Sequence, residues 1–359
     1  MKIYLKLSKA ANVAARSLVP NKPHHAQWLI TRKCNYRCRG CNVWKEQDPR
    51  ELPTEDIKRG LDILKDLGIA EIVLSGGDPL LRDDAAEIIE YASRLFLTTV
   101  YDNGSMALEK IDALRKADFV AISIDSLDAA KNDYIKGVPG AWKKAMEAVE
   151  TLHAEGIGVN VTPTISQLNL NEIVDLTNYF SQKDIPLWYS FYSFDLPADA
   201  NQLFRIGKMN DEFVITDTQA MIELCDSLIK MKKDNKNILM TTKLLKTLKK
   251  LYLEGERTWK CRALENFFVI DHLGRIAGCH SHNCAASVFD LPKMWKSQEF
   301  NLLRKTYRKC TQCTYLCYIF YSLHGGAYGN LSLARDQWKN AKLLLKRNHV
   351  ILPTLAKIQ

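Results

Sequence analysis

The chain of 359 residues is 47% hydrophobic and carries a formal net charge of +9. This length can bury a sizeable core in one large domain and a smaller one, and no low-complexity tract or solenoid-like repeat interrupts it. The first twenty residues lack the apolar core of a signal peptide, and no later apolar run is long enough to span a bilayer. We therefore expect a cytoplasmic protein, in which ten cysteines indicate metal or redox chemistry rather than disulfides.

Both ends of the chain are basic. The segment 1–25 has lysines and arginines without acids as far as Pro23, and from Phe300 onward Asp336 is the sole acid. Such charge attracts acidic partners, which include an acidic ferredoxin or flavodoxin as electron donor, an anionic substrate, or a peripherally contacted membrane. The amphipathic stretch 331–348 would lie on lipid or, as we prefer, pack on its own domain. No motif for RNA or DNA accompanies the charge, so nucleic acid is not favoured.

Short β-rich runs alternate with amphipathic helical stretches between residues 27 and 194. The predicted strands are 27–31, 71–74, 97–101, 119–124, 158–163 and 187–191. Strand-helix units in series predict a parallel sheet with helices on its outer face. The fold class is therefore α/β, and functional residues are expected at the carboxyl ends of the strands.

Two of the connecting helices have clear boundaries in the sequence. The stretch after Pro53 starts with Thr54 as a predicted cap and acids in its first turn, and it stops at Gly68. The stretch after Gly140 ends in the same way at Gly156.

Three cysteines follow the first predicted strand in the spacing Cys34-x3-Cys38-x2-Cys41. A zinc site would need a fourth ligand, and His24 and His25 lie too far before Cys34 for a familiar knuckle, although a distant residue could complete one. Three thiolates on one loop suit a cubane iron-sulfur cluster whose fourth iron stays open to an exchangeable ligand. This arrangement is typical of a catalytic cluster.

The triplet resembles the signature of radical S-adenosylmethionine (SAM) enzymes. The resemblance implies that SAM binds the open iron of a 4Fe-4S cluster and that an electron from the cluster breaks its sulfonium bond to give a 5′-deoxyadenosyl radical. It also implies a partial (β/α)6 barrel rather than a closed one. One position departs from the family, because Gly40 stands where an aromatic residue often packs beside the adenine.

The loops after the next strands carry the other candidate SAM residues. Gly76, Gly77 and Asp78 resemble the family's "GGE" element, which contacts the amino end of SAM, and we expect the glycine amides to meet a ligand; an ordinary turn is the alternative. Asn103 lies in the turn after the third strand. Ser123 and Asp125 match family positions near the SAM ribose and carboxylate, and their spacing places them on one face of a strand. Asn169 and Asn171, after the fifth strand, are expected to cap a helix.

A second group of cysteines lies in the region 259–320. Cys225 has helical spacing with apolar residues and is predicted to be buried and structural. By contrast, Cys261, a probable hairpin, Cys279, Cys310 and Cys313 resemble the shortened SPASM, or Twitch, extension of radical SAM enzymes. The resemblance implies that these four thiolates hold one auxiliary 4Fe-4S cluster. Cys284 or Cys317 could replace one of them. A structural zinc site with the same four cysteines is the alternative, and nearby His280 and His282 keep it open.

The predicted organisation has a barrel core and a small Cys-rich α+β extension. The segments are a basic N-terminal segment (1–25), the radical SAM core (26–195), a helical connection (196–258), the Twitch-like domain (259–320) and a basic C-terminal helix and tail (321–359). The function predicted first is hydrogen abstraction from a substrate that the sequence does not identify, for an oxidation or other C-H modification assisted by the auxiliary cluster. A peptide-modifying maturase and a lipid or isoprenoid-modifying enzyme are the rivals, and the substrate is a small molecule, a lipid or a peptide. A non-catalytic iron-sulfur carrier is the hypothesis from another class, and it would not need the loops at the strand ends.

Overall fold

A computed structural model describes residues 2–19, 22–46, 48–193, 210–255, 257–280, 284–310 and 315–325, together with 331, 333 and 336. Among them, the strands are β1 (His25–Thr31), β2 (Glu71–Gly76), β3 (Leu97–Asp102), β4 (Phe119–Ile122), β5 (Val159–Val161), β6 (Thr164–Ile165), β7 (Ser190–Phe191), β8 (Phe267–Ile270), β9 (Arg275–Ala277) and β10 (Ala286–Ser287). The α-helices are α1 (Lys2–Ser17), α2 (Thr54–Leu67), α3 (Ala85–Leu95), α4 (Ile111–Leu114), α5 (Ala129–Lys136), α6 (Ala141–Ala154), α7 (Ile173–Gln182), α8 (Thr218–Met231), α9 (Thr242–Glu254), α10 (Leu291–Met294), α11 (Gln298–Lys309) and α12 (Leu316–Leu323).

The core of the fold is a parallel sheet in which β1 to β5 lie in chain order. Each strand pairs in parallel with the next. The sheet then continues through a bridge from Val161 to Leu187, while β6 and β7 form a separate pair. The described strands do not close into a ring, since β10 and β5 end the ladder. The predicted α/β class and partial barrel are confirmed.

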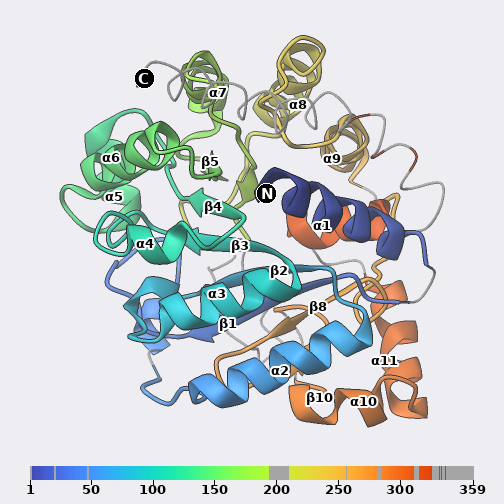
Figure 1. Cartoon of the computed structure of the whole chain (residues 1–359). Coiled ribbons are helices and arrows are strands. Elements are labelled where there is room, and N and C mark those ends of the chain that lie inside the picture. The colour runs from blue at the N-terminus through green and yellow to red at the C-terminus, as the bar shows by residue number, and fades with distance from the viewer. Residues whose placement is uncertain are drawn as a thin grey trace.

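The helices between the strands cover the outer face of the sheet. Figure 1 shows α3 in front of the strands β1 and β2, with α2 beside it on the same side of the sheet. Trp28 of β1 is fully buried and packs so closely on α2 that a side chain at Gly60 would meet its ring at 2.5 Å. Burying a ring of this size is among the larger apolar contributions that one side chain makes to a core.

One predicted helix cap is wrong. Helix α2 begins at Thr54, Pro53 occupies the cap position, and no side chain caps the helix. The Thr54 hydroxyl instead donates to Asp84 at the start of α3, at 2.5 Å. The predicted stop is confirmed, because Gly68 has the left-handed φ of 107° that ends the helix.

The hairpin predicted in the Cys-rich region forms, and it joins the main sheet. Strands β8 and β9 pair in antiparallel fashion, and β8 pairs in parallel with β1 from His25 opposite Phe267 to Trp28 opposite Ile270. The extension therefore shares a sheet with the barrel instead of standing apart. The predicted boundary at 195 falls in the segment 194–209, outside the described residues.

The basic N-terminal segment folds as helix α1 against the barrel. Lys6 donates to the Asp118 carbonyl at 2.8 Å, and Lys9 forms an ion pair with the Asp118 carboxylate at 2.7 Å. Two of its lysines are therefore used inside the fold. In the part of the chain that the structure describes, no helix has the length and apolarity needed to cross a membrane. The amphipathic stretch 331–348 lies outside the described residues except for 331, 333 and 336.

Candidate functional site

The three-cysteine loop follows β1 at the carboxyl end of the sheet. Cys34, Cys38 and Cys41 are each partly buried. The backbone amide of Tyr36 hydrogen-bonds the Cys34 thiol, and that of Val43 hydrogen-bonds the Cys41 thiol. Burial raises the pKa of Cys34 to about 11 and that of Cys41 to about 12. Metal binding here would therefore have to displace protons, which is the usual coupling for thiolate sites.

Three thiols on one loop are a donor set that suits an iron-sulfur cluster. Within the described ranges, no three His, Cys, Asp or Glu side chains come together closely enough to hold one metal ion. A cubane is bound through thiolates on different irons, so its ligands need not converge on one point. The ligand assignments themselves stay predictions.

The loop after β2 lies against the residues that precede Cys34. A Cβ at Gly76 would be 2.2 Å from the Thr31 carbonyl oxygen, and one at Gly77 would be 2.2 Å from the Lys33 carbonyl oxygen. The Gly77 amide donates to Thr31 and the Asp78 amide donates to Lys33. The expectation that both glycine amides face a ligand is therefore wrong for Gly77. The glycines let two backbone segments touch, and they position the base of the cysteine loop.

An acidic group lies beside this loop. Asp78 is 1% exposed, and burial raises its pKa. Burial and then the negative charge of Asp78 raise the pKa of Asp102, at the end of β3, well above its usual value. The two side chains also share a hydrogen bond, so one proton is held between the carboxyl groups. A cation bound beside these two carboxyl groups would favour the ionised form of both. The pair therefore suits an ammonium or sulfonium ligand.

Asn103 connects this acidic group to the cysteine loop. Its amide nitrogen donates to the Asn35 side chain at 2.9 Å, and its oxygen accepts from the Ser105 amide at 2.8 Å. Asn35 in turn donates to the Ser105 hydroxyl at 2.7 Å. The structure thus brings the candidates Asp78 and Asn103 together next to Cys34. The negative charge of Asp78 contributes to the raised pKa of the Cys34 thiol.

Ser123 and Asp125 meet at a residue that the sequence did not single out. The ammonium of Lys136 lies 2.5 Å from the Ser123 hydroxyl and 2.7 Å from the Asp125 carboxylate. Lys136 lies close enough to the cysteine loop for its positive charge to lower the pKa of Cys38 and of Cys41. The only hint in the sequence was the Lys-Gly pair that ends α5.

Asn169 does not cap a helix with its side chain. Its oxygen accepts from the Ser166 amide, and its nitrogen donates to the carbonyl oxygens of Asp125 and Thr164. It therefore ties the loop after β4 to the loop after β5. The capping prediction for this residue is wrong.

The position before Cys41 has no room for a ring. A Cβ at Gly40 would be 2.8 Å from the Tyr192 ring and 3.3 Å from the Phe213 ring. These two rings lie 5.2 Å apart and, with Ile135, form a small apolar cluster separate from the main core. Aromatic side chains from elsewhere in the chain thus fill the space next to Gly40.

The second cysteine group is only partly described. Cys261 and Cys279 are buried, Cys310 is half-buried, and all three thiols lie close enough to Tyr307 to help raise the pKa of its phenol. Tyr307 also accepts a hydrogen bond from the Gly278 amide at 3.1 Å. Cys313 lies in the segment 311–314, outside the described residues.

The two spare cysteines lie elsewhere. Cys317 is close to Tyr101 and Tyr321 on the barrel side of α12, and exposed Cys284 is close to Asp271 and Arg275. Cys225 is buried in α8, as predicted.

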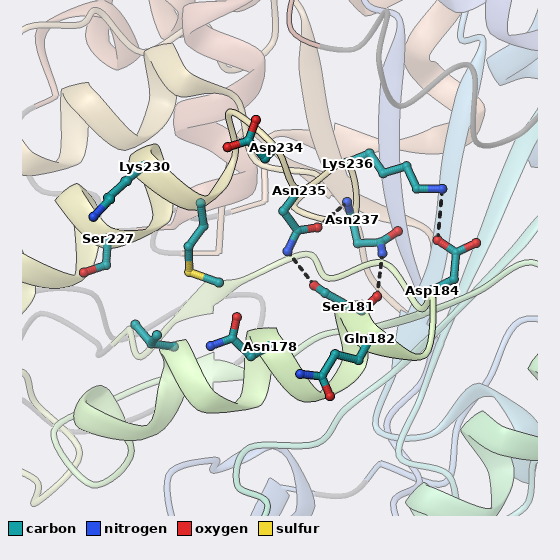
Figure 2. A pocket seen from close by; sticks show the side chains of 12 residues that line it. Asn178, Ser181, Gln182, Asp184, Ser227, Lys230, Asp234, Asn235, Lys236 and Asn237 are labelled. Atoms are coloured by element: carbon teal, nitrogen blue, oxygen red, sulfur yellow. Dashed lines mark hydrogen bonds and ion pairs between the residues drawn. The ribbon is translucent and has the colours of Figure 1, made fainter.

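A surface pocket of about 690 Å³ lies between α7, α8 and the loop 234–237 (Figure 2). Its polar side chains largely satisfy one another: Asn235 donates to the Ser181 hydroxyl, Asn237 donates to the Ser181 carbonyl, and Lys236 pairs with Asp184. None of the candidate cysteines or SAM residues lines it. We do not assign the candidate site to this pocket.

The fold and these residues agree with known proteins. Residues 28–180 match the Radical SAM superfamily. The AdoMet-dependent heme synthase of Nitratidesulfovibrio vulgaris is 32% identical over 170 residues, which cover 46% of this chain and 46% of that protein. The chain thus spans about half the length of the curated relatives it matches.

Solved structures resemble the chain over most of its length. SuiB of Streptococcus suis bound to its precursor peptide SuiA has a TM-score of 0.65 at 18% identity, covering 90% of this chain and 76% of SuiB. The enzyme anSMEcpe with bound AdoMet and the Kp18Cys peptide has a TM-score of 0.61 at 12% identity, covering 91% of this chain and all of that one. At these identities the likeness concerns the fold.

Proposed function

We propose that this chain, whose residues 28–180 match the Radical SAM superfamily, is an enzyme that cleaves SAM reductively and abstracts hydrogen from a substrate. The observation that carries the proposal is the meeting of Cys34, Asp78 and Asn103 at one end of the sheet. A non-catalytic carrier would need the thiols but not an acidic group beside them.

The residues of the chain have separate tasks in this proposal. Cys34, Cys38 and Cys41 would hold a 4Fe-4S cluster, which with SAM bound supplies a 5′-deoxyadenosyl radical through one-electron cleavage of the sulfonium bond. Asp78 and Asp102 would hold the amino group of SAM, because a buried carboxyl pair gains most from a cation that lets both ionise. Ser123 and Asp125, which Lys136 joins, would lie near the ribose and carboxylate of SAM.

For the second cysteine group we propose an auxiliary 4Fe-4S cluster held by Cys261, Cys279, Cys310 and Cys313. Three of these thiols lie close enough to Tyr307 to help raise its pKa, which supports a shared site. Such a cluster would accept the electron that a substrate radical gives up, so that the overall reaction is an oxidation. Zinc at this position remains the competing assignment, and metal analysis separates the two.

For the substrate, an anionic tetrapyrrole is our first candidate and a peptide our second. The tetrapyrrole is supported by the name and 32% identity of the heme synthase relative, and the peptide only by a shared fold with peptide-bound SuiB. Incubation of the reduced enzyme with an iron tetrapyrrole that carries propionate groups, followed by mass spectrometry, tests the first candidate. The lipid option rests on the two basic ends of the chain, and at the N-terminal end Lys6 and Lys9 are engaged with Asp118.

An acidic ferredoxin or flavodoxin is the proposed electron donor. Arg37, Arg39 and Lys45 are exposed around the cysteine loop, and Arg37 donates directly to the Cys34 carbonyl at 3.0 Å. Positive side chains so close to the cluster loop favour docking of a negatively charged partner.

The test of the proposed function is uncoupling. Anaerobically reconstituted protein reduced with dithionite should convert SAM to 5′-deoxyadenosine, and a Cys310→Ala, Cys313→Ala double variant should keep this cleavage while product formation from substrate falls at least tenfold. Circular dichroism must first show that the variant is folded, because loss of a four-thiolate site can unfold its region. Wild-type protein that makes no 5′-deoxyadenosine refutes the proposal, and a folded double variant with full product yield refutes the oxidative role of the second site.

A further inference from the structure

Lys136 is a buried cation with a fixed set of partners. It is 5% exposed, and its ammonium contacts the Asp125 carboxylate at 2.7 Å and the Ser123 hydroxyl at 2.5 Å. A buried charge is costly unless it is paired and hydrogen-bonded, and here one carboxylate and one hydroxyl do both. Although burial disfavours its charged form, the Asp125 carboxylate raises the pKa of Lys136, so the ammonium is retained.

The end of α5 is locked onto the cysteine loop on both sides of Cys38. The Arg39 amide donates to the Ile135 carbonyl at 2.9 Å. Gly137 has a φ of 66°, and a Cβ there would lie 2.1 Å from the Arg37 carbonyl oxygen. Residues 37–39 therefore lie directly on residues 135–137, and Cys38 stands opposite Lys136.

The Lys136 charge acts on two of the three thiols. Cys38 lies between the two backbone contacts that Arg37 and Arg39 make with Gly137 and Ile135, so the Lys136 ammonium is held beside this thiol. Cys34, at the other end of the loop, has Arg37 rather than Lys136 as its cationic neighbour.

We propose that Lys136 sets the reduction potential of the cluster bound by Cys34, Cys38 and Cys41, by stabilising its reduced form. This inference rests on the proposed function, since it needs a cluster at these thiols. Reduction adds one negative charge to the cluster, and a buried cation at close range stabilises the added charge because little water screens it. Lys136 is thus a positioning residue that eases the electron transfer on which SAM cleavage depends.

The experiment is a redox titration of the reconstituted full chain without SAM, followed by electron paramagnetic resonance of the reduced cluster. Lys136→Met keeps the length of the side chain and removes its charge. At a fixed potential it should lower the ratio of reduced to oxidised cluster about tenfold, which for a one-electron couple is about 59 mV. Lys136→Arg should keep the wild-type ratio within about threefold.

Two further variants control for general charge effects. Lys131→Met removes the same charge from the same helix, but Lys131 pairs with Glu172 at the surface and its side chain is 37% exposed, so no shift is expected. Asp125→Asn leaves the ammonium unbalanced and should shift the ratio in the opposite direction from Lys136→Met.

The possible outcomes distinguish a failure of the Lys136 proposal from a failure of the proposed function. Unchanged potentials in Lys136→Met and Asp125→Asn overturn the inference, even if SAM binds more weakly, because Lys136 would then serve the ligand alone. An equal loss of iron in Lys136→Met and Lys136→Arg also overturns it, in favour of a structural role. A wild-type protein with no 4Fe-4S signal that these cysteines control refutes the proposed function itself.

Discussion

The two cysteine groups are built in different ways. Cys34, Cys38 and Cys41 lie within eight residues on one loop after β1, whereas the described members of the second group come from three separate places between 261 and 310. The first group is held together by the covalent chain and by contacts to the loops after β2, β3 and α5. The second is assembled by the fold around Tyr307. Losing cysteines should therefore cost the first group its metal and the second its stability as well.

The largest expected difference is between cysteine variants of the two groups. Reconstituted wild-type protein should bind about eight irons, and Cys34→Ala, Cys38→Ala, Cys41→Ala should bind about four, because each cubane holds four. These thiols are partly exposed. When both proteins are iron-free, the free energy of unfolding of the triple variant should therefore stay within about 1 kcal/mol of that of the wild type. Cys261→Ser, Cys279→Ser places hydroxyls at buried positions and should lower it by about 2–4 kcal/mol.

Iron analysis and chemical denaturation measure both quantities. The comparison fails if the triple variant unfolds as readily as the Cys261, Cys279 variant. Stoichiometric zinc with the iron of only one cluster would mean that the second group binds zinc.

A smaller difference is expected between glycines near to and far from the first group. Gly76→Ala and Gly77→Ala drive a Cβ to 2.2 Å from the backbone of residues 31 and 33, so each should lower the free energy of unfolding by at least about 2 kcal/mol and reduce iron loading. Gly140→Ala is the control, because its φ of 77° is strained but no atom lies within 4 Å. It should cost only about 1–2 kcal/mol and leave iron unchanged. Full iron content in Gly76→Ala would show that the cysteine loop does not depend on this contact.

A pH dependence of similar size is expected at the seam between the two regions. His24 precedes β1, its amide donates to the Asn266 carbonyl just before β8, and burial, followed by the charge of His25, lowers its pKa to about 4. Because the folded pKa lies below the usual 6.5, the stability from neutral His24 is present above pH 6.5 and is lost as the pH falls toward 4.

The loss between pH 7 and pH 4 should be about 3 kcal/mol. His24→Phe keeps a buried ring without the titration, and its unfolding free energy should fall by about that much less over the same range. Urea denaturation at both pH values measures this, and parallel curves for the two proteins would rule His24 out as the cause.

The fold could be predicted where the signal was local. Strand runs separated by helices with clear stops predicted the order of β1 to β5 and the α/β class. The pairing of β8 with β1 could not be predicted, because it joins residues 267–270 to residues 25–28. The pattern of apolar residues in a strand does not indicate which distant strand it pairs with. The cap at Thr54 failed for a similar reason, since its hydroxyl has a better acceptor in Asp84, thirty residues away.

The site shows the same division. Motif spacing singled out the cysteines and the loops after the strands as candidates, and in the structure Asp78 and Asn103 lie together beside Cys34. Asp102 and Lys136 were missed because their importance comes from burial beside other charges, which spacing does not reveal. The glycines were identified, but their contact is with the chain's own backbone at Thr31 and Lys33.

The parallel pairing of β8 with β1 has a consequence for dissecting this protein into pieces. A chain cut before residue 259 would keep every cysteine of the first group but would leave β1 as an unprotected edge, with its backbone donors and acceptors open over residues 25–28. Exposed edges of this kind recruit strands from other molecules. The barrel taken alone is therefore expected to self-associate, and the Cys-rich region acts as the cover that keeps the barrel from doing so.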